Sequence, residues 1–147
     1  MKENQNRTEH PIKKTEKEYE TFILENIDVI SENCKWGDIK KIERQYRIPL
    51  KKGHIIADIM IWHTDGSGTC IEIKTGKNNR NDDLTAIGQL LFYGLITEHS
   101  LINMPRLVLA TTKIKSELWD VSKRFELPIN FLEVTDNKCI YLSNGAR

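Results

Sequence analysis

The feature that most constrains the fold is a pair of apolar segments separated by residues typical of a tight turn. Residues 54–62 read HIIADIMIW, and residues 69–75 read TCIEIKT. Both segments are rich in β-branched residues at alternating positions, which is the pattern of β-strands. The intervening Asp65-Gly66-Ser67-Gly68 has the composition of a hairpin turn. The sequence therefore predicts an antiparallel β-hairpin.

Charged side chains interrupt both strands of this hairpin. Period-2 geometry places Glu72 and Lys74 on one face of the second strand. In the first strand it predicts one face with Ile55, Ala57, Ile59 and Ile61, and the other with Ile56, Asp58, Met60 and Trp62. Buried charges are costly unless they pair or hold a cation. A solvated ion pair on an open sheet face is the alternative for Glu72 and Lys74, but it does not account for Asp58 within an apolar strand.

Two carboxylates, from Asp58 and Glu72, suit Mg²⁺, which prefers oxygen ligands and retains several waters. A lysine beside such an ion can orient a bound water or help to deprotonate it. The ion itself stabilises charge that develops on a phosphate. The hairpin thus predicts a site for metal-assisted hydrolysis.

The rest of the chain alternates between helical and strand patterns. Thr15, with Glu18 three positions later, is a helix N-cap signal, and apolar residues follow at helical spacing. We expect further elements in this order: a strand at Ile39–Leu50, where Pro49 requires an edge position or a strand end; a helix at Leu84–Glu98; a strand at Arg106–Thr112; a helix from Ile114 to Phe125; and strands at Ile129–Val134 and Cys139–Leu142. This order predicts an α/β domain with a mixed central sheet flanked by helices. Polar, aperiodic residues 1–13 predict a disordered lead before a single domain at 14–147.

Asp58, followed by Glu72-Ile73-Lys74 in a β-hairpin after a helix that carries Glu16, resembles the PD-(D/E)xK nuclease superfamily. The downstream Gln89-Leu-Leu-Phe-Tyr93 is similar to the Q-x-x-x-Y element of the branch with RecB-type and NucS-like nucleases. The resemblance extends over residues 15–112 and implies a restriction-endonuclease-like core. It departs from the superfamily pattern at Ala57, where a proline is common.

The resemblance implies that Asp58 and Glu72 bind Mg²⁺, or Mn²⁺ as a substitute, with the Ile73 carbonyl as a third oxygen. It implies that Lys74 positions the attacking water. Gln89 and Tyr93 would orient the site or touch the nucleic acid; their i, i+4 spacing puts them on one side of a helix.

The resemblance also implies a carboxylate from the first helix that holds metal or water. Glu16, Glu18 and Glu20 are the candidates. We favour Glu16 because only this residue lies one turn before Tyr19 and two turns before Ile23.

The charge balance limits how the chain can bind nucleic acid. The chain has 22 Lys and Arg against 21 Asp and Glu, a formal charge of +1, so contacts must come from a local patch. Between Lys35 and His54 there are seven basic and two acidic residues. We expect DNA as the partner, because the resemblance is to DNA-processing branches, with contacts from Lys40, Lys41, Arg44, Lys77 and Arg80. A homodimer or a larger complex is the alternative source of affinity.

Several classes are disfavoured by the sequence. It has no apolar run near the roughly 20 residues that span a bilayer, and its start lacks a signal-peptide core, so we expect an intracellular, cytoplasmic protein. Three widely spaced cysteines predict reduced thiols rather than a disulfide framework or a zinc site. The remaining alternative to a nuclease is a catalytically silent, nuclease-like subunit for DNA binding or assembly.

Overall fold

The computed structural model describes residues 15–75, 80–97 and 104–143. The predicted disordered lead at residues 1–13 lies outside this part of the chain. The described elements are α2 (Glu16–Glu25), α3 (Ile27–Cys34), β1 (Ile39–Pro49), β2 (His54–His63), β3 (Gly68–Lys74), α4 (Arg80–Thr97), β4 (Arg106–Thr111), α5 (Ser116–Arg124), β5 (Ile129–Val134) and β6 (Cys139–Leu142).

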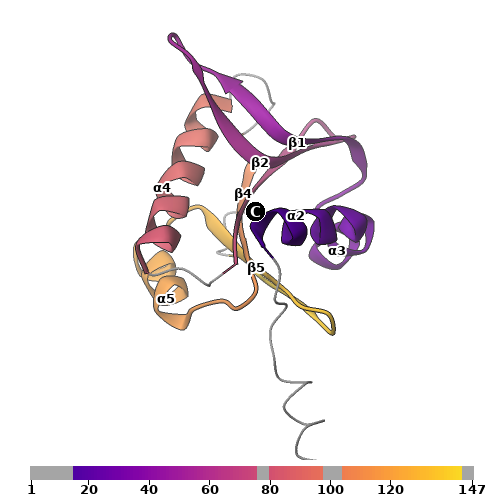
Figure 1. Cartoon of the computed structure of the whole chain (residues 1–147), viewed down its shortest axis with the longest axis vertical. Helices are drawn as coiled ribbons and strands as arrows, with labels where there is room; N and C mark the ends of the chain where they lie inside the picture. Colours follow the sequence, from indigo (N-terminus) through magenta and orange to yellow (C-terminus); the bar gives the residue numbers. More distant parts are fainter. Residues whose placement is uncertain (1–14, 76–79, 98–103, 144–147) are drawn as a thin grey trace, which may run out of the picture.

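The six strands form one sheet in the order β1-β2-β3-β4-β5-β6 (Figure 1). β1, β2 and β3 pair antiparallel, β3, β4 and β5 pair parallel, and β6 is antiparallel to β5. The predicted mixed sheet and α/β class are therefore confirmed. β1 is an edge strand, as Pro49 indicates.

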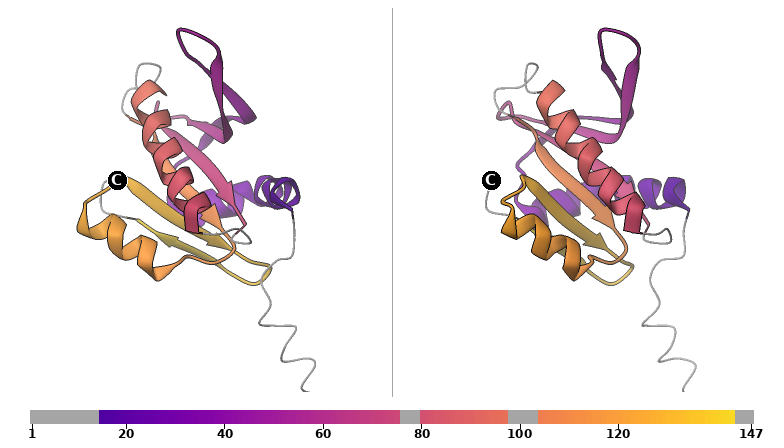
Figure 2. Two further views of the ribbon diagram at one scale, coloured as in Figure 1. Left: turned by 60° about the vertical axis from the view of Figure 1, so that its left-hand side comes forward. Right: turned by 90° about the vertical axis from the view of Figure 1, so that its left-hand side faces the viewer.

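Helices cover both faces of the sheet. α2 and α3 lie on one face, and the crossover helices α4 and α5 lie on the other (Figures 1 and 2). Each face has its own apolar cluster: the α2-side core includes Ile23 and Ile71, and the α4-side core includes Leu90 and Leu109. The sheet is thus the middle of three layers.

Helix α2 is fixed at its start and along its buried side. Thr15 and Glu18 form a reciprocal capping box, as the sequence predicts. The fully buried Tyr19 donates its hydroxyl to the Thr111 carbonyl at 2.7 Å and to the Val134 carbonyl at 2.8 Å. Because these contacts tie α2 to β4 and β5, they fix where its acidic side chains lie.

The helix that follows α2 was not predicted. Asn26 both ends α2 and begins α3, with φ −112° and ψ 14°. Ile27, Ile30 and Cys34 of α3 are buried in the α2-side core. Their helical spacing was the available signal.

The strict alternation predicted for β2 is wrong at Asp58. Ala57 packs in the α4-side core, but Ile59 packs in the α2-side core, although two residues apart should share a face. The opposite strand changes face at the same level, where Gln45 has the left-handed φ of 52°. Such a conformation costs a residue other than glycine about 1–3 kcal/mol. As a result Asp58 lies on the α2 side, away from its predicted neighbour Met60.

Candidate active site

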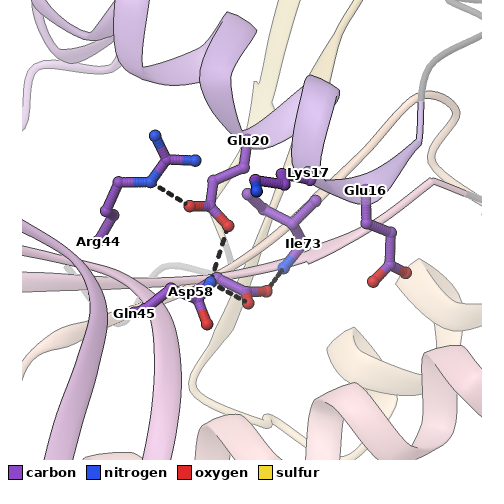
Figure 3. Close-up of a pocket in the computed structure, with 7 residues that line it drawn as sticks. All are labelled: Glu16, Lys17, Glu20, Arg44, Gln45, Asp58 and Ile73. Carbon is purple, nitrogen blue, oxygen red and sulfur yellow. Dashed lines mark hydrogen bonds and ion pairs between the residues drawn. The ribbon is translucent and has the colours of Figure 1, made fainter.

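A polar pocket of about 720 Å³ lies beneath the first turns of α2 (Figure 3). Its lining comes from α2, from the irregular part of β1, and from the strands of the hairpin. The lining residues are Glu16, Lys17, Glu20, Arg44, Gln45, Asp58 and Ile73. The pocket therefore brings the predicted Asp58, Ile73 and Glu16 together with Lys17 and Gln45, which the sequence did not indicate, while Glu72 and Lys74 do not line it.

The pairing of β2 with β3 covers Ile59 to Trp62 of β2. Asp58 directly precedes this paired stretch, at the point where the two strands separate. Its Oδ2 accepts a hydrogen bond from the Ile73 N–H at 2.8 Å. Burial raises the pKa of Asp58, and the negative charges of Glu20 and Glu16 raise it further, against the opposing effects of the Ile73 N–H and Gln45. The carboxylate is thus held in place but is electrostatically unfavourable when ionised.

Glu72 is more deeply buried than Asp58, with only 5% of its surface exposed. Among the described residues none donates a hydrogen bond to its Oε1. Burial, followed by the charge of Asp58, raises the pKa of Glu72 to about 8, while Lys74 and the Asp58 N–H act in the opposite direction. Burial and the neighbouring charge of Asp58 thus oppose the ionisation of Glu72, and one Glu72 oxygen is unsatisfied. Together with Asp58 it forms a donor set that a divalent cation would neutralise.

The residues present therefore fit a hard cation, although they make no complete ligand cage. Within the described ranges, no three His, Cys, Asp or Glu side chains lie close enough to hold a metal ion. Mg²⁺ commonly binds through only one or two carboxylates and fills its other positions with water or substrate. Asp58 and Glu72 match that pattern. The role predicted for the Ile73 carbonyl stays a prediction.

Lys74 follows Glu72 by two residues at the end of β3 and is partly exposed. Its positive charge lowers the pKa of Glu72, so the ammonium group lies within electrostatic reach of that carboxylate. This placement is compatible with the predicted role in orienting water.

The acidic side chains of α2 divide into three roles. Glu16 is exposed, lines the pocket, and raises the pKa of both Asp58 and Glu72. Glu18 caps the helix through Thr15. Glu20, which the sequence analysis set aside, is buried in the pocket wall. Its position one turn after Glu16 was the signal that could have found it.

Glu20 is held by β1. Its Oε1 accepts a hydrogen bond from the Arg44 Nε at 2.7 Å, and its Oε2 accepts one from the Gln45 Nε2 at 2.9 Å. The same Gln45 nitrogen lies 3.4 Å from the Asp58 Oδ1. These contacts connect the pocket wall to the predicted metal ligand (Figure 3).

The predicted Q-x-x-x-Y pair lies on α4, on the opposite side of the sheet from α2. Tyr93 is buried and donates its hydroxyl to the Ile56 carbonyl at 2.9 Å. Burial, and then the charge of Glu72, raises the pKa of Tyr93. The Gln89 Oε1 is buried and accepts no hydrogen bond within the part of the chain described. Tyr93 thus anchors α4 to β2 near Glu72, and its role toward nucleic acid stays a prediction.

The predicted nucleic-acid contacts on β1 are exposed, but two of them have partners. Lys41 pairs with Glu43 at 2.8 Å, and Arg44 is engaged by Glu20. Lys40 is exposed. Lys77 lies outside the described residues, and Arg80 begins α4 with its side chain outside them.

The three cysteines, Cys34, Cys70 and Cys139, are free thiols in the structure. Among the helices in the described ranges, none has the length and apolar character needed to cross a membrane.

Comparison with solved structures identifies a nuclease of similar fold. The crystal structure of a repair endonuclease from Pyrococcus abyssi matches the chain with a TM-score of 0.59 and 21% sequence identity. The match covers 86% of this chain and 49% of the other, so this chain spans about half the length of that endonuclease. No family model matches the chain, and no curated protein matches it. The chain therefore has the α/β fold of a repair endonuclease.

Proposed function

We propose that this chain is a metal-dependent nuclease of the PD-(D/E)xK type that hydrolyses phosphodiester bonds in DNA. The observation that carries the proposal is the pair formed by the partly buried Asp58 and the buried Glu72. Burial and the charge of Asp58 raise the pKa of Glu72, burial raises that of Asp58, and a polar pocket adjoins Asp58. Such a pair is costly to the fold on its own and is neutralised by a divalent cation. The fold shared with a repair endonuclease supports the proposal.

In this proposal Asp58, Glu72 and the Ile73 carbonyl would hold Mg²⁺, which Mn²⁺ could replace. When bound, such an ion would supply a water of lowered pKa and would offset charge on the phosphate. Lys74 orients the attacking water through its ammonium group, and Glu16 accepts a hydrogen bond from that water. The water oxygen bonds to phosphorus as a bridging P–O bond breaks; the water gives up a proton to solvent, and the leaving oxygen takes one.

DNA contacts would come from exposed lysines of the edge strand β1, chiefly Lys40 and Lys41. The Lys41 pair with Glu43 is at the surface, where ion pairs are weak, about 0–1 kcal/mol, and readily exchange for phosphate. Arg44 serves the pocket wall as well, because it holds Glu20. With a formal charge of only +1, a second copy of the chain or a partner would add affinity.

The test is incubation with end-labelled single-stranded, duplex and branched DNA in Mg²⁺, in Mn²⁺ and in EDTA. We expect products only with metal, and we expect Lys74→Ala to lower the cleavage rate by several decades while DNA binding persists, because a water-positioning group is lost. DNA binding without cleavage in every metal condition would instead favour the silent binding subunit.

A further inference from the structure

Gln45 has a backbone conformation that its place in the fold does not explain. Of the residues described, three other than glycine have positive φ: Lys35 at 57°, Gln45 at 52° and Glu126 at 51°. Lys35 and Glu126 follow helices α3 and α5, where left-handed residues are common. Gln45 is in the middle of β1, where extended backbone is the rule.

The unusual φ determines which way the Gln45 side chain points. Ile42 packs against the α2-side core and Tyr46 against the α4-side core, although an even spacing should place them on one face. The change of face therefore occurs around Gln45. Its side chain reaches the α2 side, as does that of its neighbour Arg44 (Figure 3).

In this position the Gln45 amide joins two carboxylates. Nε2 donates to the Glu20 Oε2 at 2.9 Å and lies 3.4 Å from the Asp58 Oδ1. Glu20 is itself buried and held by Arg44 at 2.7 Å, so it is a fixed anchor for the amide. Both Glu20 oxygens already accept a hydrogen bond, one from Arg44 and one from Gln45, so Glu20 supports Gln45 and is not a metal ligand.

The amide completes the orientation of Asp58. The Ile73 N–H holds Oδ2 from one side, and the Gln45 amide approaches Oδ1 from the other. Two donors on two oxygens fix the plane of a carboxylate, and each oxygen keeps a lone pair for a further ligand. Loss of a group that holds a metal ligand in place by a hydrogen bond commonly lowers metal affinity by about 10- to 100-fold.

We infer that Gln45 is a positioning residue that orients Asp58 for metal binding, and that its left-handed backbone conformation is retained for this purpose. The inference rests on the proposed metal site and adds to it a residue outside the predicted motif. A glutamine that merely tolerated a bend in β1 would have no effect on metal affinity.

The substitution Gln45→Gly tests this role because glycine adopts positive φ without strain. We expect this variant to stay folded and to bind Mn²⁺, followed by electron paramagnetic resonance, about 10-fold more weakly than the unaltered chain. Glu126→Gly is the matched control, since it makes the same backbone change at φ 51° after α5. It should leave Mn²⁺ affinity unchanged.

A second variant tests the same role if Gln45→Gly does not fold. Gln45→Asn favours the left-handed conformation but carries an amide one methylene shorter, so it should also weaken Mn²⁺ binding. If the folded variants of Gln45 bind Mn²⁺ as tightly as the Glu126→Gly control, the inference is overturned while the metal site stands. If the unaltered chain binds no Mn²⁺, the proposed metal site fails, and the role of Gln45 fails with it.

Discussion

Replacing Glu72 with glutamine should remove most of the pH dependence of stability in the metal-free protein. The pKa of Glu72 rises from its ordinary value of 4.5 to about 8 in the fold. The folded state therefore binds more protons than the unfolded state between these two values, and the free energy of unfolding falls as pH rises through this range. The destabilisation is absent below pH 4.5 and complete above pH 8.

The size of the effect follows from the same pKa. At 1.36 kcal/mol for each pH unit, the rise corresponds to about 5 kcal/mol. This figure is a ceiling, because part of the rise comes from the charge of Asp58, and proton uptake by Asp58 would relieve that part. Above pH 8, Glu72→Gln should be more stable than the unaltered chain by about 2 kcal/mol or more. Below the ordinary pKa of a glutamate side chain the two proteins should differ little.

Urea denaturation in EDTA, followed by tryptophan fluorescence across this pH range, measures the difference. Trp36 is buried in the α2-side core and reports unfolding. Glu32→Gln, which changes an exposed carboxylate on α3, is the control and should follow the unaltered chain. Parallel pH profiles for Glu72→Gln and Glu32→Gln would refute the burial and repulsion assigned to Glu72.

Three further predictions concern metal, DNA and the fold. Millimolar Mn²⁺ should raise the melting temperature of the unaltered chain, with a gain of about 2.7 kcal/mol at one hundred times Kd; Asp58→Asn should lose this response, and a normal response would contradict its role. Lys40→Glu with Lys41→Glu should weaken DNA binding and lower the slope of log K against log salt by about 0.9 per lost phosphate contact; an unchanged slope in a titration would place the DNA elsewhere. Tyr19→Phe should lower the free energy of unfolding by about 1–3 kcal/mol, because two buried carbonyls lose their donor; urea denaturation with no change would show that the hydroxyl does not hold α2.

The elements that could be predicted from the sequence depend on local patterns. The hairpin is confirmed: Gly66 in its turn has a φ of 88°, and Asp65 accepts hydrogen bonds from the Ser67 backbone and hydroxyl at 2.9 and 2.6 Å. Glycine and aspartate encode such a turn within four residues. The strands at Ile129–Val134 and Cys139–Leu142 have the predicted bounds, because short apolar runs next to turn residues are also a local signal.

Features that depend on contacts between distant segments could not be predicted in this way. Glutamine has no preference for positive φ, so nothing in residues 39–49 indicates the change of face at Gln45. The buried position of Glu20 depends on Arg44, which lies on another element. The charge pattern of β1 suggested a free basic patch, but Arg44 in that patch is paired with Glu20 in the pocket wall.

The central claim is that Asp58 and Glu72 bind the divalent cation that DNA hydrolysis by this chain requires. The most direct measurement is the single-turnover cleavage rate of end-labelled DNA by Glu72→Gln, with Glu32→Gln as control, in Mg²⁺ and in EDTA. We predict that Glu32→Gln cleaves as the unaltered chain does and only with Mg²⁺, while Glu72→Gln remains folded, binds DNA and is slower by several decades. Cleavage by Glu72→Gln at the control rate, or equal cleavage in EDTA, would contradict the account.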